Sequence, residues 1–163
     1  MPDFSTYAWN QLAPVTSPEA RVGHAMVWDG SRIIMFGGGT AYPLALGNQS
    51  DTWEFDGSEW TNLSPATTPP ARKYHSMVWD GASVLMYGGV GTPDYLSDLW
   101  EFDGSDWTNI TPGTAVPPKR MRHLAAWNGS AMIMYGGQEG GVVKKDTWSW
   151  NGSAWSQLSP THY

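Results

Sequence analysis

Short apolar runs separated by turns predict strands along the whole chain. Residues 24–28 alternate in period two, and residues 32–36 are apolar on both faces, as in a strand covered on both sides. Asp29-Gly30 between them suits a tight hairpin turn. Two further strands are predicted at 52–55 and 60–63, and no segment shows helical periodicity. The pattern therefore predicts an all-β fold.

This four-strand pattern is repeated. The spacings between His24, His75 and His123 are 51 and 48 residues, and nine of the eleven Trp residues fall into three aligned columns: 28/79/127, 53/100/148 and 60/107/155. A partial copy precedes the first unit and aligns Trp9 with Trp60, which predicts an extra N-terminal strand. We expect a single domain over 1–163, with a partial repeat at 1–14 and complete units at about 21–64, 72–111 and 120–160.

Composition and charge narrow the function classes. The net charge is −6 and the nine Lys and Arg residues are scattered, which argues against nucleic acid as a partner. No apolar run approaches membrane-spanning length, so no membrane partner is expected. The first ten residues lack the basic and apolar regions of a signal peptide, and nothing else indicates a location. The chain has no Cys, which excludes disulfides, thiolate metal ligands and cysteine nucleophiles.

A double glycine after the second strand of each unit, with the Trp columns, resembles the kelch repeat of β-propellers. The Arg-x-x-His openings and Asp-x-Trp blocks look most like bacterial kelch proteins related to the central propeller of galactose oxidase. The resemblance implies that each unit is one four-stranded blade, running from a central axis outward. The radical-copper chemistry of galactose oxidase needs a Tyr crosslinked to Cys, so neither that activity nor any cofactor is expected here.

The number of blades is unusual, because propellers commonly carry four to eight. Three blades leave one aromatic-rich face open at each end, and such faces normally find a partner. We expect two chains to close a six-bladed ring as a homodimer. A truncated or engineered part of a longer propeller, or a natural fragment, is the alternative.

Two columns of side chains are candidate ligand groups at the mouth of the axis. The arginine guanidinium groups, one in each unit, could bind a carboxylate or phosphate through paired hydrogen bonds. Alternatively, each Arg pairs inside the fold with Asp51, Asp98 or Asp146, and each His packs between blades, so no metal site is predicted. The candidates are Arg21, Arg72, Arg120, His24, His75 and His123.

The connections after the double glycines vary most, with 12 residues in the first unit and 8 in each of the others. Tyr42 and Tyr95 lie in these loops and complete the candidate site. An anionic or carbohydrate ligand is the expected occupant of the channel mouth. The sequence thus favours a non-catalytic binding or scaffold module that presents loops on a propeller face. Its alternatives are an enzyme subunit whose site forms at the axis on assembly, and a ligand-free structural, truncated or engineered propeller fragment.

Overall fold

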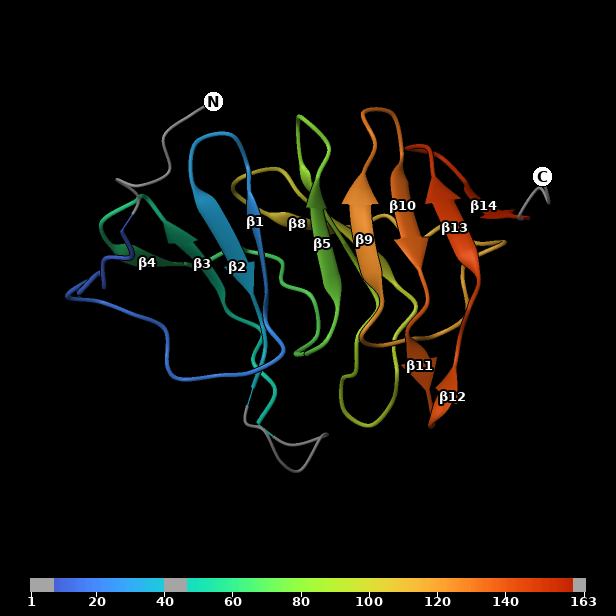
Figure 1. Ribbon diagram of the computed structural model, residues 1–163, viewed down its shortest axis with the longest axis horizontal. Helices are drawn as coiled ribbons and strands as arrows, with labels where there is room; N and C mark the ends of the chain where they lie inside the picture. Colours follow the sequence, from blue (N-terminus) through green and yellow to red (C-terminus); the bar gives the residue numbers. More distant parts are fainter. Residues whose placement is uncertain (1–7, 40–46, 160–163) are drawn as a thin grey trace.

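Three antiparallel four-stranded sheets make up the computed structural model, which describes residues 8–39 and 47–159 (Figure 1). We call the sheets blades 1, 2 and 3. Blade 1 consists of β1 (Ala25–Trp28), β2 (Ile33–Phe36), β3 (Thr52–Phe55) and β4 (Trp60–Leu63). Blade 2 consists of β5 (Ser76–Trp79), β6 (Val84–Tyr87), β7 (Leu99–Phe102) and β8 (Trp107–Asn109). Blade 3 consists of β9 (Leu124–Trp127), β10 (Met132–Tyr135), β13 (Thr147–Trp150) and β14 (Trp155–Leu158).

Within each blade the strands follow one another in order, each pairing with the next. The innermost strands of neighbouring blades pack on one another, β1 on β5 and β5 on β9 (Figure 1). The blades therefore fan out from a shared axis. The predicted all-β fold of three four-stranded kelch blades is confirmed, although a short hairpin in blade 3 was not predicted: β11 (Gln138–Glu139) and β12 (Val142–Val143).

The core consists of two apolar layers, one at each junction between blades. Ile34 and Phe36 of blade 1 pack against Met86, Phe102 and other side chains of blade 2. The opposite face of blade 2 packs against blade 3 through a second cluster: Val78, Leu85, Tyr87, Leu99, Met132, Met134, Trp150 and Trp155. Alternate residues of β6 thus face opposite junctions, Val84 and Met86 toward blade 1 and Leu85 and Tyr87 toward blade 3, which explains why this strand is apolar on both faces.

The predicted N-terminal strand is not formed in residues 8–14, and Trp9 is fully exposed. The remainder of that partial repeat, residues 1–7, lies outside the described residues. An outermost strand needs the third strand of its own blade as a hydrogen-bonding neighbour. The described chain provides no such neighbour for residues 8–14, because β4 already occupies the outer edge of blade 1. A membrane-crossing helix is not found in the part of the chain described.

We expect Trp107→Ala to lower the free energy of unfolding by about 3–5 kcal/mol, as large aromatic truncations in cores do. The Trp107 side chain is 1% exposed, and its ring lies edge-on to Phe36 with a centroid distance of 5.2 Å. Urea unfolding followed by circular dichroism measures the change. Trp9→Ala makes the same truncation at a fully exposed position and should leave the midpoint unchanged. Equal midpoints for the two variants would contradict the assignment of Trp107 to the core.

Candidate functional site

A buried arginine at the entrance of each blade holds the aspartate of its own repeat. The guanidinium group of Arg72 donates from Nη1 and Nη2 to the Asp98 carboxylate at 2.6 and 2.7 Å. Nη1 also donates to the Gly88 carbonyl and Nε to the Pro70 carbonyl, each at 3.0 Å. Arg120 repeats this arrangement with Asp146 in blade 3.

The main chain of the same arginine binds the preceding blade. The Arg72 N–H donates to the Gln49 carbonyl at 3.1 Å, and the Arg72 carbonyl accepts from Gly38 N–H at 2.9 Å. A Cβ on Gly37, beside Gly38, would lie 2.5 Å from the Arg72 carbonyl oxygen, so this approach requires glycine. The double glycine and the arginine therefore form one junction between two blades.

The internal pairing that the sequence left open as an alternative is the arrangement present. Arg21 binds Asp51 through two hydrogen bonds of 2.6 and 2.9 Å, and the side chains of Arg72 and Arg120 are fully buried. These guanidinium groups are neutralised by carboxylates inside the fold, so we place no ligand on them. The hydrogen bonds from Arg120 hold the pKa of Asp146 at about 2, below its ordinary value of 3.8.

Each of the candidate histidines directly precedes the innermost strand of its blade, and two of the three are buried between blades. His123 Nε2 lies 2.8 Å from the Ser76 hydroxyl, and its ring packs edge-on against Tyr87. Burial, with a smaller effect of the Arg120 charge, lowers the pKa of His123 to about 3, so the ring is neutral. His75 packs against Phe36 in the same way, and burial lowers its pKa also.

His24 differs from the other two, because no blade covers it and its side chain is exposed. Its pKa is lowered by partial burial and by the Arg21 charge. Within residues 8–39 and 47–159, no group of three or more His, Cys, Asp or Glu side chains is placed to hold a metal ion.

The loops after the double glycines border one edge of the fan. Tyr42 lies outside the described residues, whereas Tyr95 is half-buried and bridges back to Val90 within its loop. An ion pair between Lys119 and Asp94 links this loop to the segment that enters blade 3. The corresponding loop of blade 3 forms the β11–β12 hairpin, where Val142 and Val143 are 67% and 77% exposed.

Tyr74 and Arg122 are candidate ligand residues that the sequence analysis missed. Each occupies the position before the histidine, with a left-handed backbone, where blade 1 has Gly23. Tyr74 N–H donates to the Gly23 carbonyl at 2.7 Å, and Arg122 N–H donates to the Tyr74 carbonyl at 2.8 Å. The exposed Arg122 guanidinium lies 4.6 Å from the centroid of the Tyr74 ring. The available signal was variation at one position of an otherwise constant motif.

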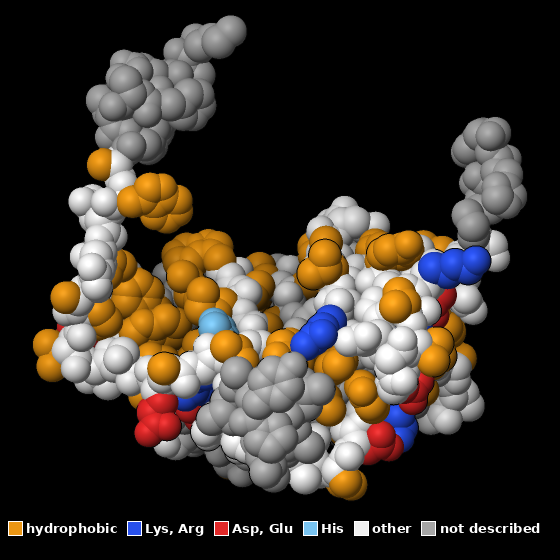
Figure 2. All heavy atoms as spheres, turned by 60° about the horizontal axis from the view of Figure 1, so that its bottom comes forward, with side chains coloured by type: hydrophobic (Ala, Val, Ile, Leu, Met, Phe, Trp, Pro, Cys, Tyr) orange, Lys and Arg blue, Asp and Glu red, His pale blue; other side chains and the backbone are white. Residues whose placement is uncertain are grey.

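Basic side chains do not form one patch on this edge of the molecule. Figure 2 shows Lys and Arg side chains at several separate places, some with acidic side chains beside them. Because the three arginines that enter the blades are paired with aspartates, their charges are neutralised inside the fold.

The Arg120–Asp146 pair predicts a specific acid response. Because the folded pKa of Asp146 is depressed to about 2, its contribution to stability is complete above pH 3.8 and is lost as the pH falls through about 2. We expect Asp146→Asn to lower stability near neutrality by about 2–3 kcal/mol, as loss of a charged hydrogen bond does. The variant should also show a shallower decline between these pH values. Urea titrations from pH 7 to 2 measure both.

Asp106→Asn is the control for this experiment, because it makes the same charge change at a carboxylate whose hydrogen bonds come from the main-chain N–H groups of Thr67 and Trp107 and not from an arginine. It separates the general effect of charge from the pairing with Arg120. Parallel pH profiles for wild type and Asp146→Asn would rule out the pair as a source of acid sensitivity.

Comparison with known proteins agrees with the fold. The sequence matches the KLHDC2/KLHL20/DRC7 Kelch-repeats domain family over residues 1–163. It is 30% identical to Kelch domain-containing protein 10 of Rattus norvegicus over 96 residues, which cover 53% of this chain and 23% of that protein. The Homo sapiens protein of the same name is also 30% identical, with 22% of its length covered. Adagio-like protein 1 of Oryza sativa subsp. japonica is 32% identical over 88 residues, covering 50% of this chain and 14% of that protein.

The chain therefore spans less than a quarter of the length of these relatives. The narrower resemblance to bacterial kelch proteins related to galactose oxidase is not confirmed by these matches. The kelch-domain relatives point to a protein-interaction or scaffold module. On the family match over its whole length and its three four-stranded blades, the chain belongs to the kelch-repeat β-propeller family.

Proposed function

We propose that the chain is a non-catalytic module that binds an acidic segment of a partner protein at the loop-bearing edge around Tyr74 and Arg122. The observation that carries this proposal is the accessible guanidinium of Arg122 above the Tyr74 ring. The loops that differ between blades lie beside this pair, because the residues before Tyr74 and Arg122 form bridges to the loop residues Val90 and Gln138.

The scaffold beneath the loops is constant, which allows the loops to vary. In every blade the first glycine of the pair donates to the main chain of the aspartate that ends the loop, at 3.1 Å in blade 1 and 3.2 Å in the other two. The arginine side chain binds both of these residues. Each loop is therefore closed at its base by the same contacts, whatever its sequence, and loops on such rigid supports commonly carry binding residues.

The chemistry of the axial pair favours a carboxylate. Among the described residues, the Arg122 guanidinium has the Tyr74 ring as its contact and neither an ion pair nor a side-chain hydrogen bond. Its planar donors match a carboxylate, and the ring beneath restricts its orientation. Lys119 lies three residues before Arg122 in the segment that enters blade 3, and it is already ion-paired with Asp94. Met121, next to Arg122, pairs with Gln138, and Gln138 pairs with Val143, so the exposed Val142 and Val143 provide a nearby apolar surface for the rest of a peptide.

The test is a fluorescence-polarisation measurement with labelled peptides of equal length that are acidic, neutral or basic, each with one aromatic residue. We expect the acidic peptides to bind best and their affinity to fall as salt rises. Arg122→Gln should weaken acidic-peptide binding by about tenfold or more, because a charged hydrogen bond is lost. Lys145→Gln, which removes an exposed charge elsewhere on blade 3, should not.

Equal binding of acidic and basic peptides, or equal effects of Arg122→Gln and Lys145→Gln, would contradict the proposal. Acidic oligosaccharides form a further arm of the experiment. Arg122-dependent binding of uronic-acid oligomers without any binding of acidic peptides would replace a protein partner by a carbohydrate.

A further inference from the structure

At each of the two junctions between blades, a tryptophan of the later blade packs on the face of the earlier blade, where three side chains lie in a row. In blade 1 the row is Phe36, Thr52 and Leu63, which are directly opposite one another on β2, β3 and β4. Trp107 packs against Phe36 with a ring distance of 5.2 Å, and its Nε1–H donates to the Thr52 hydroxyl at 3.0 Å. At the second junction Trp155 packs against Tyr87 of blade 2 in the same way, at 5.1 Å.

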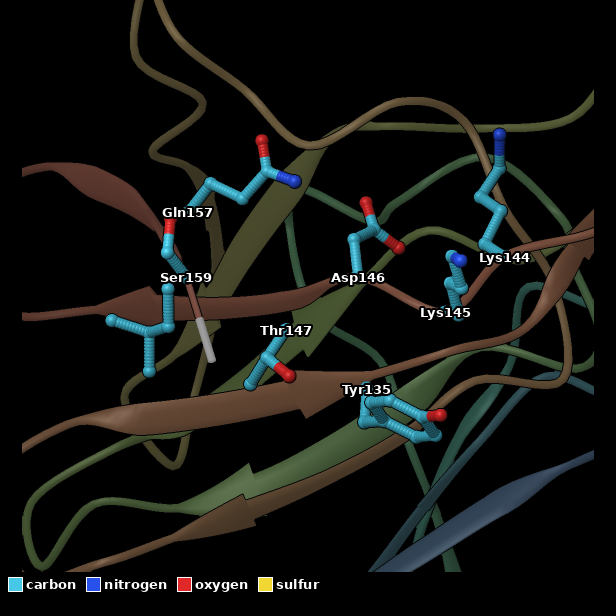
Figure 3. A pocket seen from close by; sticks show the side chains of 8 residues that line it. Tyr135, Lys144, Lys145, Asp146, Thr147, Gln157 and Ser159 are labelled. Atoms are coloured by element: carbon cyan, nitrogen blue, oxygen red, sulfur yellow. The ribbon is translucent and has the colours of Figure 1, made fainter. Parts of the chain in front are cut away.

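Blade 3 carries the same row on its outer face, and there it borders a cavity. Tyr135, Thr147 and Leu158 are opposite one another on β10, β13 and β14. They line a cavity of about 860 Å³, and Figure 3 shows Tyr135 and Thr147 together with Lys144 and Lys145 around it. Tyr135 and Leu158 are 58% and 43% exposed, whereas Phe36, the counterpart of Tyr135 in blade 1, is fully buried.

Blade 1 carries the tryptophan that would complete this row. Trp60 is the counterpart of Trp107 and Trp155 but has no blade against it, and it is only half-buried. It already has the orientation of a packed residue: its ring lies 5.0 Å from Phe55 at 38°, as Trp107 lies 5.0 Å from Phe102 at 36°. Figure 2 shows hydrophobic side chains gathered over this end of the molecule, where Trp28 and Met26 are 57% and 49% exposed.

We propose that the cavity on blade 3 binds Trp60 of a second copy of this chain, so that two copies close one ring. The indole of Trp60 packs against Tyr135, and its Nε1–H donates to the Thr147 hydroxyl. In the same register the Arg122 carbonyl of one copy accepts from Gly23 N–H of the other, continuing the hydrogen bonds that join Gly23 to Tyr74 and Tyr74 to Arg122.

A second copy is the occupant that the observations favour, because both halves of the interface are present in one chain and match its internal junctions. A two-fold axis then pairs blade 3 of each copy with blade 1 of the other, so neither of the two faces is left open. Six blades lie within the range in which propellers close. The proposed contacts use the main-chain carbonyl of Arg122 and not its guanidinium, which lies over Tyr74 of its own chain. This inference therefore goes beyond the proposed function, and Arg122→Gln, which keeps the carbonyl, should leave the assembly intact.

Light scattering over a dilution series tests the assembly. We expect a mass of twice 17.9 kDa that falls toward the single-chain value on dilution. Tyr135→Glu should give the single-chain mass at every concentration, because it places a charge against the indole. Tyr135→Phe is the matched control and should retain the dimer, since Phe36 fills this position beneath Trp107. Thr147→Val should raise the dimer Kd about tenfold, because one neutral hydrogen bond is lost at each of two interfaces.

Circular dichroism at low concentration confirms that each variant is folded, and Trp60→Ala tests the other half of the contact. Trp9→Ala shows whether the exposed Trp9 of the partial repeat, and not Trp60, makes the contact. A single-chain mass for wild type at all concentrations would overturn the proposal. So would a dimer that survives Tyr135→Glu, or one that Trp9→Ala disrupts and Trp60→Ala does not.

Discussion

The rest of the structure depends on the ion pair between the arginine that precedes each blade and the aspartate of the same repeat. The Arg72 side chain joins the two ends of its own loop through Asp98 and the Gly88 carbonyl, while its main chain joins the preceding blade through Gln49 and Gly38. Removing one partner of such a buried pair leaves an uncompensated charge. Loop closure and blade packing are therefore coupled through one arginine in each of blades 2 and 3.

Most of the fold could be predicted from the sequence, because strand periodicity and tight turns are local signals that three copies reinforce. The role of the arginines could not, because spacing alone does not show whether Arg72 points toward Asp98 or toward solvent. The N-terminal strand was predicted from alignment with Trp60, but a strand also needs a neighbour, which residues 8–14 lack. Tyr74 and Arg122 were missed because they do not repeat, although their shared left-handed backbone does.

Constant and variable positions of the repeat have different structural roles. Positions that are constant across the blades, such as the tryptophans at 107 and 155, are buried at junctions. Positions that vary, such as Tyr74 and Val142, lie on loops or at the axis, where a substitution leaves the junction contacts in place. In this chain, repetition marks structural roles, and departures from it mark the residues available for recognition.

At each of the two junctions between blades, either the tryptophan or the histidine of the later blade makes a side-chain hydrogen bond to a hydroxyl of the earlier blade. Trp107 bonds to Thr52 at the first junction, where Ala25 takes the place of a serine; His123 bonds to Ser76 at the second, where Trp155 lies over Leu99 and its Nε1–H has no acceptor. Blades 2 and 3 each bring a histidine and a tryptophan to the junction, and the face of the preceding blade offers a hydroxyl to only one of them. The two junctions therefore contain the same number of these hydrogen bonds although different side chains make them, so the position of one hydroxyl on the preceding blade decides whether the tryptophan or the histidine is bonded.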